Sequence, residues 1–290
     1  MFQGSFVALV TPFKNGKIDE EALKNIIEFQ VSNGTNGIVP CGTTGESATL
    51  SVEEHNQVVE ITVQAVNGRI PVIAGSGSNS TGEAIKLTRH AKEVGANAAL
   101  HITPYYNKPT QEGLYQHFKK IAGEVDIPII LYNVPGRTSV NMLPETTARL
   151  AEIKNIVGIK EATGNLQQIS ETIKLCGDNF SVISGDDANT LPIIAAGGNG
   201  VISVTANIAP EKISALCKSC LEGNFSDARK LHYELLDLNN IMFIETSPVP
   251  VKTSLSLMGK ITGELRLPLT SLSESSLSKL KILLKQSGIV

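Results

Sequence analysis

Short apolar segments alternate with longer amphipathic segments along most of this 290-residue chain. The apolar segments are rich in Val, Ile and Ala and are only five or six residues long, as expected of buried β-strands. Eight of them can be recognised, at residues 6–10, 37–41, 71–75, 99–103, 128–133, 156–160, 181–185 and 200–204. A regular alternation of this kind indicates an α/β fold with a parallel sheet.

The segments between these predicted strands have the features of helices. One begins at Asp19 and another at Ser51, where Ser51 and Glu54 have the spacing of a capping box. Both end near an Asn or Gly, as helix C-termini often do. Eight strand-and-helix units favour a (β/α)8 TIM barrel. The main alternative, a doubly wound sheet, is disfavoured because the first turn, TPFKNGKID, lacks a glycine-rich phosphate-binding pattern.

The strand pattern stops at about Pro210. The sequences PEKISALCKSCLEG, SDARKLHYELLDLNNIMF and SESSLSKLKILLKQSG that follow all predict helices. No low-complexity or linker-like stretch separates them from the preceding part of the chain. We therefore expect a barrel domain at residues 1–224 and a helical C-terminal extension at residues 225–290.

Composition argues against several classes of function. A net charge of −3, 4% aromatic residues and no Trp disfavour nucleic-acid binding. No apolar run is long enough for a membrane span, and the N-terminal segment lacks signal-peptide features, so we expect a cytoplasmic protein. Cys217 and Cys220 form a CxxC, but without a second cysteine pair or clustered histidines we interpret them as small helical core residues. The sequence predicts no metal site and no Ser/His or Cys/His catalytic site.

Lys160 is the unusual residue, because it lies inside the apolar strand IVGIK. Alternation places Lys160 and Gly158 on one face, and Val157, Ile159 and Glu161 on the other. If the bulky face packs on the helices, Lys160 points into the barrel. A lysine in such surroundings has a lowered pKa, and its neutral amine is a nucleophile. The alternative is a lysine that extends to water or pairs with an acid.

Other polar residues lie where predicted strands end, at the barrel face that carries active sites. Tyr132 is on the strand before Lys160, at a similar depth, where its phenol can relay a proton or simply be a core group. Thr43 and Thr44 lie between two glycines, in a loop that either binds a carboxylate or only forms a tight turn. Arg137, in a Pro-Gly loop, can bind a carboxylate with two hydrogen bonds or remain solvated.

At these residues the chain resembles a known family. The motifs GTTGES (42–47), TPYYNKPTQEGLYQHF (103–118), YNVPGRT (132–138), GIKEATG (158–164) and SGDD (184–187) occur in the expected order. They resemble the dihydrodipicolinate synthases, pyruvate-dependent Schiff-base aldolases related to N-acetylneuraminate lyase. The resemblance extends over essentially the whole chain. It implies a TIM barrel that needs neither a metal nor a bound cofactor.

The resemblance implies that Lys160 forms an imine with pyruvate and that the enamine then attacks aspartate semialdehyde. The product would be 4-hydroxy-tetrahydrodipicolinate, on the path to diaminopimelate and lysine. A homotetramer built from two tight dimers is also implied. The implied catalytic residues are Lys160, Tyr132, Thr43 and Tyr106, the last supplied by the neighbouring subunit. The implied substrate-binding residues are Thr43 and Thr44 for the pyruvate carboxylate, Arg137 for the second substrate, and Gly185 and Ile202, which line the pocket.

The resemblance further implies an inhibitory lysine site. Its residues would be Ser47, Ala48, His55, Asn79, Glu83 and Tyr105. Asn79 and Glu83 also fit a plain helix N-terminus. Two positions depart from the family pattern: Val52 stands where some lysine-sensitive members have histidine, and Ser139 stands where glycine is usual next to the Arg137 loop. Two other functions compatible with the sequence are a pyruvate aldolase for a sugar acid such as N-acetylneuraminate or a 2-keto-3-deoxy acid, and a keto-acid sensor without turnover.

Overall fold

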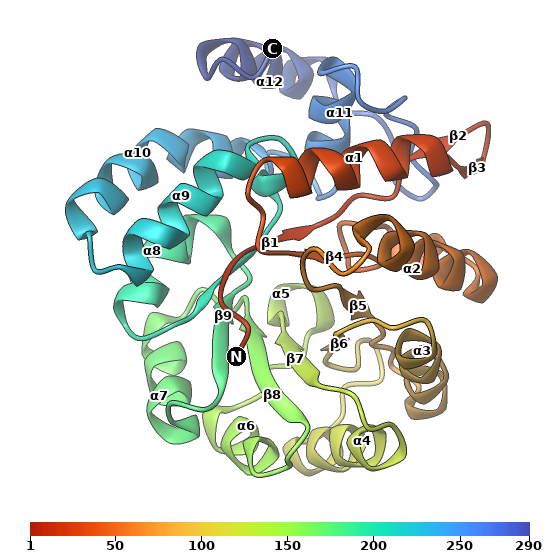
Figure 1. The fold of residues 1–290 in the computed structure, drawn as a ribbon, viewed down its shortest axis with the longest axis vertical. Coiled ribbons are helices and arrows are strands. Elements are labelled where there is room, and N and C mark those ends of the chain that lie inside the picture. Colours follow the sequence, from red (N-terminus) through yellow and green to blue (C-terminus); the bar gives the residue numbers. More distant parts are fainter.

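The computed structural model describes all 290 residues, and eight parallel strands form a barrel at its centre (Figure 1). The hydrogen-bonded order is β4-β1-β10-β9-β8-β7-β6-β5, and a parallel bridge between Ile38 and Val72 links β4 to β5 and closes the ring. The predicted (β/α)8 barrel and its eight strands are confirmed, with ends shifted by at most two residues. The strands are β1 Gly4–Ala8, β4 Gly37–Val39, β5 Ile73–Gly75, β6 Ala98–Ile102, β7 Ile129–Asn133, β8 Ile156–Glu161, β9 Ser181–Ser184 and β10 Gly200–Ser203.

Helices surround these strands in Figure 1. Those of the barrel are α1 Glu20–Ser32, α2 Val52–Val66, α3 Thr81–Glu93, α4 Gln111–Glu124, α5 Pro135–Thr138, α6 Pro144–Ala151, α7 Leu166–Cys176, α8 Thr190–Ala195 and α9 Pro210–Leu221. The predicted helix starts are confirmed. The Asp19 side chain caps α1, and Ser51 and Glu54 form the capping box of α2. Three short 3-10 helices lie in the loops: η1 Ser47–Thr49, η2 Asp187–Asn189 and η3 Thr205–Asn207.

The first turn contains an element that the sequence pattern did not predict. Strands β2 (Phe13–Lys14) and β3 (Lys17–Ile18) pair as a small antiparallel hairpin before α1. Asn15 and Gly16 form its tip, and both have positive φ, which a tight hairpin turn of this type requires.

Side chains on alternating positions of the strands fill two different regions. One set, which includes Phe6, Ile130 and Ile202, forms a cluster inside the barrel, while the intervening residues pack against the helices. The expectation that Val157 shares the helix-facing side with Ile159 is wrong. The pairing of β7 with β8 shifts between Ile129 and Ile130, which places Val157 against the inner cluster. Such a bulge adds one residue to a strand and reverses the alternation locally.

The C-terminal extension consists of α10 (Phe225–Ile241), α11 (Val249–Leu257) and α12 (Glu274–Gln286), which lie along one side of the barrel near α1 and α9 (Figure 1). The sequence pattern predicted α10 and α12 but not α11. Buried residues of the extension, such as Leu238, Val251 and Leu280, belong to the same hydrophobic cluster as residues of β1 and α1. The barrel and the extension therefore share one hydrophobic core. The domain boundary at residue 224 stays a prediction.

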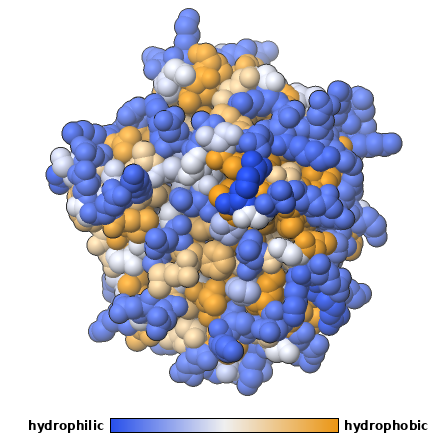
Figure 2. All heavy atoms as spheres, in the orientation of Figure 1, coloured by the Kyte–Doolittle hydropathy of each residue, from blue (hydrophilic) through white to orange (hydrophobic).

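Polar side chains cover most of the rim of the molecule in Figure 2, and hydrophobic atoms appear toward the centre of the same face. Cys217 and Cys220 are buried on α9 and form no disulfide, in agreement with their interpretation as core residues. No helix is long and apolar enough to cross a membrane.

Candidate active site

Lys160 lies inside the barrel near the carboxyl end of β8, as the strand alternation predicted. Its side chain is only 6% exposed, and it forms neither a hydrogen bond nor an ion pair. Burial lowers the pKa of the Lys160 amine to about 8; the carboxylate of Asp187 acts in the opposite direction, and the Arg137 charge adds to the lowering. A substantial fraction of this amine is therefore neutral near physiological pH.

Tyr132 is the residue of β7 that pairs directly with Lys160 across the sheet. The Lys160 Nζ atom lies 4.3 Å from the centre of the tyrosine ring, and both side chains point into the barrel. Burial raises the pKa of the Tyr132 phenol, while the Arg137 charge and the Thr43 hydroxyl lower it in part. The phenol is therefore protonated at neutral pH and lies next to the amine and the threonine hydroxyl, where it can exchange protons with a group bound on Lys160.

The loop after β4 offers hydrogen-bond donors at the same end of the barrel. Neither the Thr43 nor the Thr44 backbone N–H donates a hydrogen bond within the chain. The loop shape is fixed by a hydrogen bond from the Gly45 N–H to the Gly42 carbonyl and by one from the Thr11 hydroxyl to the Gly45 carbonyl, 2.7 Å long. Two adjacent free amides and two hydroxyls can bind a carboxylate.

Arg137 lies in the short helix α5 and lines the same cavity as Thr43 and Tyr132. Its Nη2 donates a hydrogen bond to the carbonyl of Ser247, 3.4 Å away. Ser139, which follows α5, has φ of 58°, so the serine keeps a left-handed conformation that favours glycine. Its N–H donates to the Pro135 carbonyl and closes the helical turn, so the loop that presents Arg137 is formed with serine at this position.

Gly185 lies close to Lys160. A Cβ atom on Gly185 would be 3.0 Å from Cε of Lys160 and 2.8 Å from Cβ of Ala162, so a side chain at this position would displace the lysine. Ile202 is on β10 in the inner cluster.

Two buried polar residues near the site were not singled out from the sequence. The Asp187 carboxylate accepts hydrogen bonds from the Ser203 hydroxyl and from the backbone N–H groups of Val204 and Thr205. Burial raises the pKa of this carboxyl, and the three hydrogen bonds offset part of that rise. The Ser247 hydroxyl is buried beside the cavity without a hydrogen-bond partner. Only a distant loop brings Ser247 here, which explains why local patterns missed it.

The cavity lined by Thr43, Tyr132 and Arg137 measures about 460 Å³ and has 26 lining residues. Lys160 is not one of them, but it lies directly against the ring of Tyr132. Its size suits small organic acids. No group of three or more His, Cys, Asp or Glu side chains is placed to hold a metal ion. The reactive groups of this site are thus the lysine amine, two kinds of hydroxyl and an arginine.

Comparison with known proteins identifies the family. The model of the dihydrodipicolinate synthetase family matches residues 1–287. The chain belongs to this family. A protein of Citrifermentans bemidjiense named 4-hydroxy-tetrahydrodipicolinate synthase is 61% identical over 290 residues, which cover both chains completely. The dihydrodipicolinate synthase of Aquifex aeolicus is 55% identical with a TM-score of 0.98, over 99% of each chain. That of Acinetobacter baumannii, solved with pyruvate, is 50% identical with a TM-score of 0.98 over the full length of both chains.

Tyr106, which is predicted to act in the site of a neighbouring subunit, is 90% exposed and does not line the cavity of its own chain. Its φ of 72° is left-handed, an uncommon conformation for a bulky residue. The neighbouring Tyr105 lines the cavity, and its carbonyl accepts a hydrogen bond from the Asn79 side chain, 3.1 Å away.

Most residues of the predicted lysine-binding site line one end of the same cavity. They are Ser47, Ala48, His55, Glu83 and Tyr105, with Val52 beside them. Asn79 is held against the Tyr105 carbonyl, and Glu83 accepts a hydrogen bond from Ser78. The alternative in which Asn79 caps α3 is wrong, because the Ser80 side chain caps that helix.

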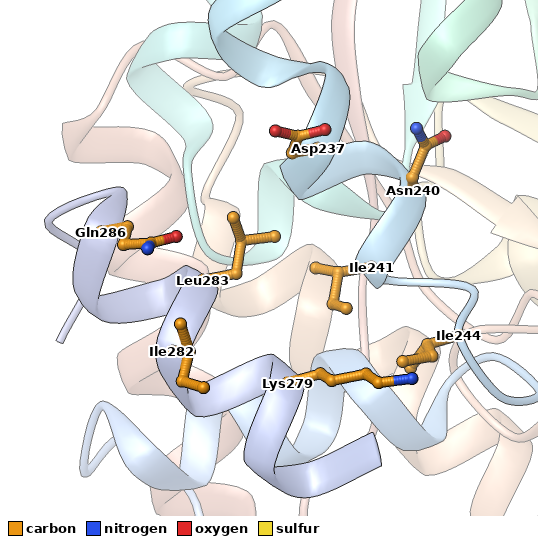
Figure 3. A pocket seen from close by; sticks show the side chains of 8 residues that line it. All are labelled: Asp237, Asn240, Ile241, Ile244, Lys279, Ile282, Leu283 and Gln286. Carbon is orange, nitrogen blue, oxygen red and sulfur yellow. The ribbon is translucent and has the colours of Figure 1, made fainter. Parts of the chain in front are cut away.

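A second hollow lies between α10 and α12, far along the chain from the strand ends that carry Lys160. Figure 3 shows the eight side chains around it, four of which are aliphatic. Its lining residues are Asp237, Asn240, Ile241, Ile244, Lys279, Ile282, Leu283 and Gln286. None of the predicted site residues is among them, so the candidate active site is the cavity next to Lys160.

Proposed function

We propose that the protein condenses pyruvate with L-aspartate 4-semialdehyde to give 4-hydroxy-tetrahydrodipicolinate, a step toward diaminopimelate and lysine. The observation that carries this proposal is Lys160, a buried amine without an ion-pair partner whose pKa is lowered to about 8. The name of the Citrifermentans bemidjiense relative, which is 61% identical over the full chain, supports the same reaction.

The first step is formation of an imine. The Thr43 and Thr44 amides and hydroxyls bind the pyruvate carboxylate, which places the keto carbon near the Lys160 amine. The neutral amine attacks that carbon, and loss of water gives a protonated imine. Tyr132 supplies and takes back the proton that this step moves, since its phenol lies beside the lysine. The protonated imine on Lys160 then acts as the electron sink, the part that a bound cofactor plays in other enzymes.

The second step forms the carbon–carbon bond. The imine withdraws electrons, the pyruvate methyl group loses a proton, and the resulting enamine carbon attacks the aldehyde of aspartate semialdehyde. Arg137 binds the carboxylate of this second substrate at the mouth of the cavity. The amino group of the substrate then attacks the imine carbon, which closes the ring and releases the Lys160 amine. The missing side chain of Gly185 leaves space beside the lysine for these intermediates, and Ile202 completes the inner wall of the barrel.

The proton relay extends from Tyr132 to Thr43 and to a Tyr106 from a second subunit. The 90% exposure of Tyr106 on its own chain favours this arrangement, because the side chain is free to enter a neighbouring site. Two copies of the chain would then complete each other's sites. We expect a homotetramer made of two such dimers.

We also propose that free lysine inhibits the enzyme at Ser47, Ala48, His55, Asn79, Glu83 and Tyr105. The Glu83 carboxylate is the group suited to the α-amino group of lysine. The His55 Nε2 atom lies 2.7 Å from the Gly75 carbonyl, and the Nδ1 atom is buried without a hydrogen-bond partner in the chain.

Steady-state turnover of pyruvate and aspartate semialdehyde, coupled to a reductase that consumes the product, tests the proposal. A signal that disappears with Lys160→Ala supports it. The sugar-acid aldolase is not favoured, because the curated relatives at 57–61% identity are named as the synthase. Cleavage of N-acetylneuraminate or a 2-keto-3-deoxy acid without condensation of aspartate semialdehyde would nevertheless support it. Calorimetric binding of pyruvate without an imine would indicate a sensor.

A further inference from the structure

The C-terminal extension reaches the mouth of the barrel through a buried ion pair. Lys252, on α11, is fully buried, and its Nζ lies 2.5 Å from Oε1 of Glu46, whose side chain is 1% exposed. The two residues are 206 positions apart in the sequence. A buried pair gains little net stability, because removing both charges from water costs about as much as their attraction returns. Its presence here therefore points to a role other than stability.

Glu46 directly follows the loop that carries Thr43 and Thr44. It has a left-handed backbone with φ of 53°, a conformation that residues other than glycine seldom adopt. Its N–H donates to the Thr43 carbonyl at 3.1 Å. Any change in the Glu46 backbone would therefore move the Thr43 peptide, whose amide group belongs to the predicted carboxylate site.

Arg266 holds the same segment from the extension. Its backbone N–H donates to the second carboxylate oxygen of Glu46 at 3.2 Å, and its Nη1 donates to the Thr49 carbonyl at 2.9 Å. The guanidinium group also forms two hydrogen bonds of 2.6 Å to Glu54 at the start of α2. Lys252 and Arg266 both lie over the Phe13 ring, at 4.3 and 4.2 Å. Hydrogen bonds from the extension therefore reach both ends of the segment from Glu46 to Glu54.

We propose that Lys252 and Arg266 are positioning residues that act through Glu46 to hold the 42–46 loop in its pyruvate-binding shape. Neither Lys252 nor Arg266 lines the cavity, whereas Glu46, which both contact, does. This inference rests on the proposed function, and it gives the C-terminal extension a part in substrate binding. The competing explanation is that the pair only supports the fold.

The test is Lys252→Met, which keeps the side-chain length and removes the charge. We expect the KM for pyruvate to rise about tenfold or more, and the KM for aspartate semialdehyde to change less than about twofold. The pyruvate concentration that gives half-maximal borohydride trapping should rise in parallel. Leu280→Ala, in the buried face of α12, is the matched control, because it weakens the extension without contacting the loop. It should leave both KM values unchanged.

The double variant Glu46→Gln/Lys252→Met separates positioning from stability. Lys252→Met alone leaves the Glu46 charge buried and unpaired, which should lower the melting temperature. The double variant removes that charge, so it should regain most of the melting temperature yet keep the raised KM for pyruvate. If Lys252→Met does not fold, Arg266→Gln replaces it, because the Arg266 side chain is 18% exposed. An unchanged pyruvate KM in the folded variant, or an equal rise in Leu280→Ala, would refute the positioning role. Absence of trapped pyruvate on the wild-type protein would instead refute the proposed function.

Discussion

The pH dependence of imine formation follows directly from the environment of Lys160. With a pKa of about 8, against 10.5 for a free lysine, about a tenth of the amine is neutral at pH 7 and about nine tenths at pH 9. The rate of imine formation should therefore rise about tenfold between these values and then level off. An ordinary lysine would be neutral to only about 0.03% at pH 7, and its rate would rise about 100-fold over the same interval.

The assay is the initial rate of borohydride-trapped pyruvate, measured by intact-protein mass spectrometry from pH 6.5 to 10 without aspartate semialdehyde. The buried Glu161 carboxyl has a pKa raised to about 7, so Glu161→Gln serves as a control for a second inflection. A rate that rises about 100-fold between pH 7 and pH 9 and has not levelled off by pH 10 would refute a lowered lysine pKa.

Other perturbations give distinct readouts. Lys160→Met should abolish trapping. It should also stabilise the fold by up to ~3 kcal/mol below pH 8, because the charged lysine is disfavoured only in the folded state. This gain should fade toward pH 10.5, and urea unfolding at pH 7 and pH 10 measures it. Tyr106→Phe should lower turnover by about 10²-fold, and an unaltered rate would exclude this tyrosine from the relay. Gly185→Ala should slow trapping, because its Cβ would be 3.0 Å from Lys160 Cε; equal trapping rates would contradict this. Millimolar lysine should inhibit, less so with Glu83→Gln, and a rate indifferent to lysine would dismiss that site.

The order and length of the strands were predictable from the sequence because each strand is short, β-branched and bounded by turn residues. The direction of Lys160 was predictable for the same reason: glycine at 158 and a bulky Ile159 mark opposite faces. Val157 was mispredicted because a shift in pairing with β7 depends on the partner strand, which alternation within one strand does not describe.

Helix α11 was missed because its sequence, VPVKTSLSL, lacks an amphipathic pattern. Most of its residues are buried, so no polar face marks it as a helix. Pro250 near its start is compatible with a helix but is read more readily as a turn. The contacts of Lys252 were beyond sequence reasoning for a different reason, since only the folded chain brings Lys252 to Glu46.

The position of the extension explains how one face of a barrel obtains a rigid anion site. The strand fixes only the start of the loop that follows it. The Thr43 and Thr44 N–H groups lie farther along the loop after β4, so other contacts must keep their orientation when no ligand is bound. A hydrogen bond from Thr11 to Gly45 fixes one side of this loop, and the Lys252–Glu46 pair fixes the other. Preorganised donors lose little entropy on binding, so energy from the pyruvate carboxylate remains available to bring the keto carbon against a buried amine. The chain that follows the barrel thereby contributes to the chemistry at Lys160 without reaching the substrate.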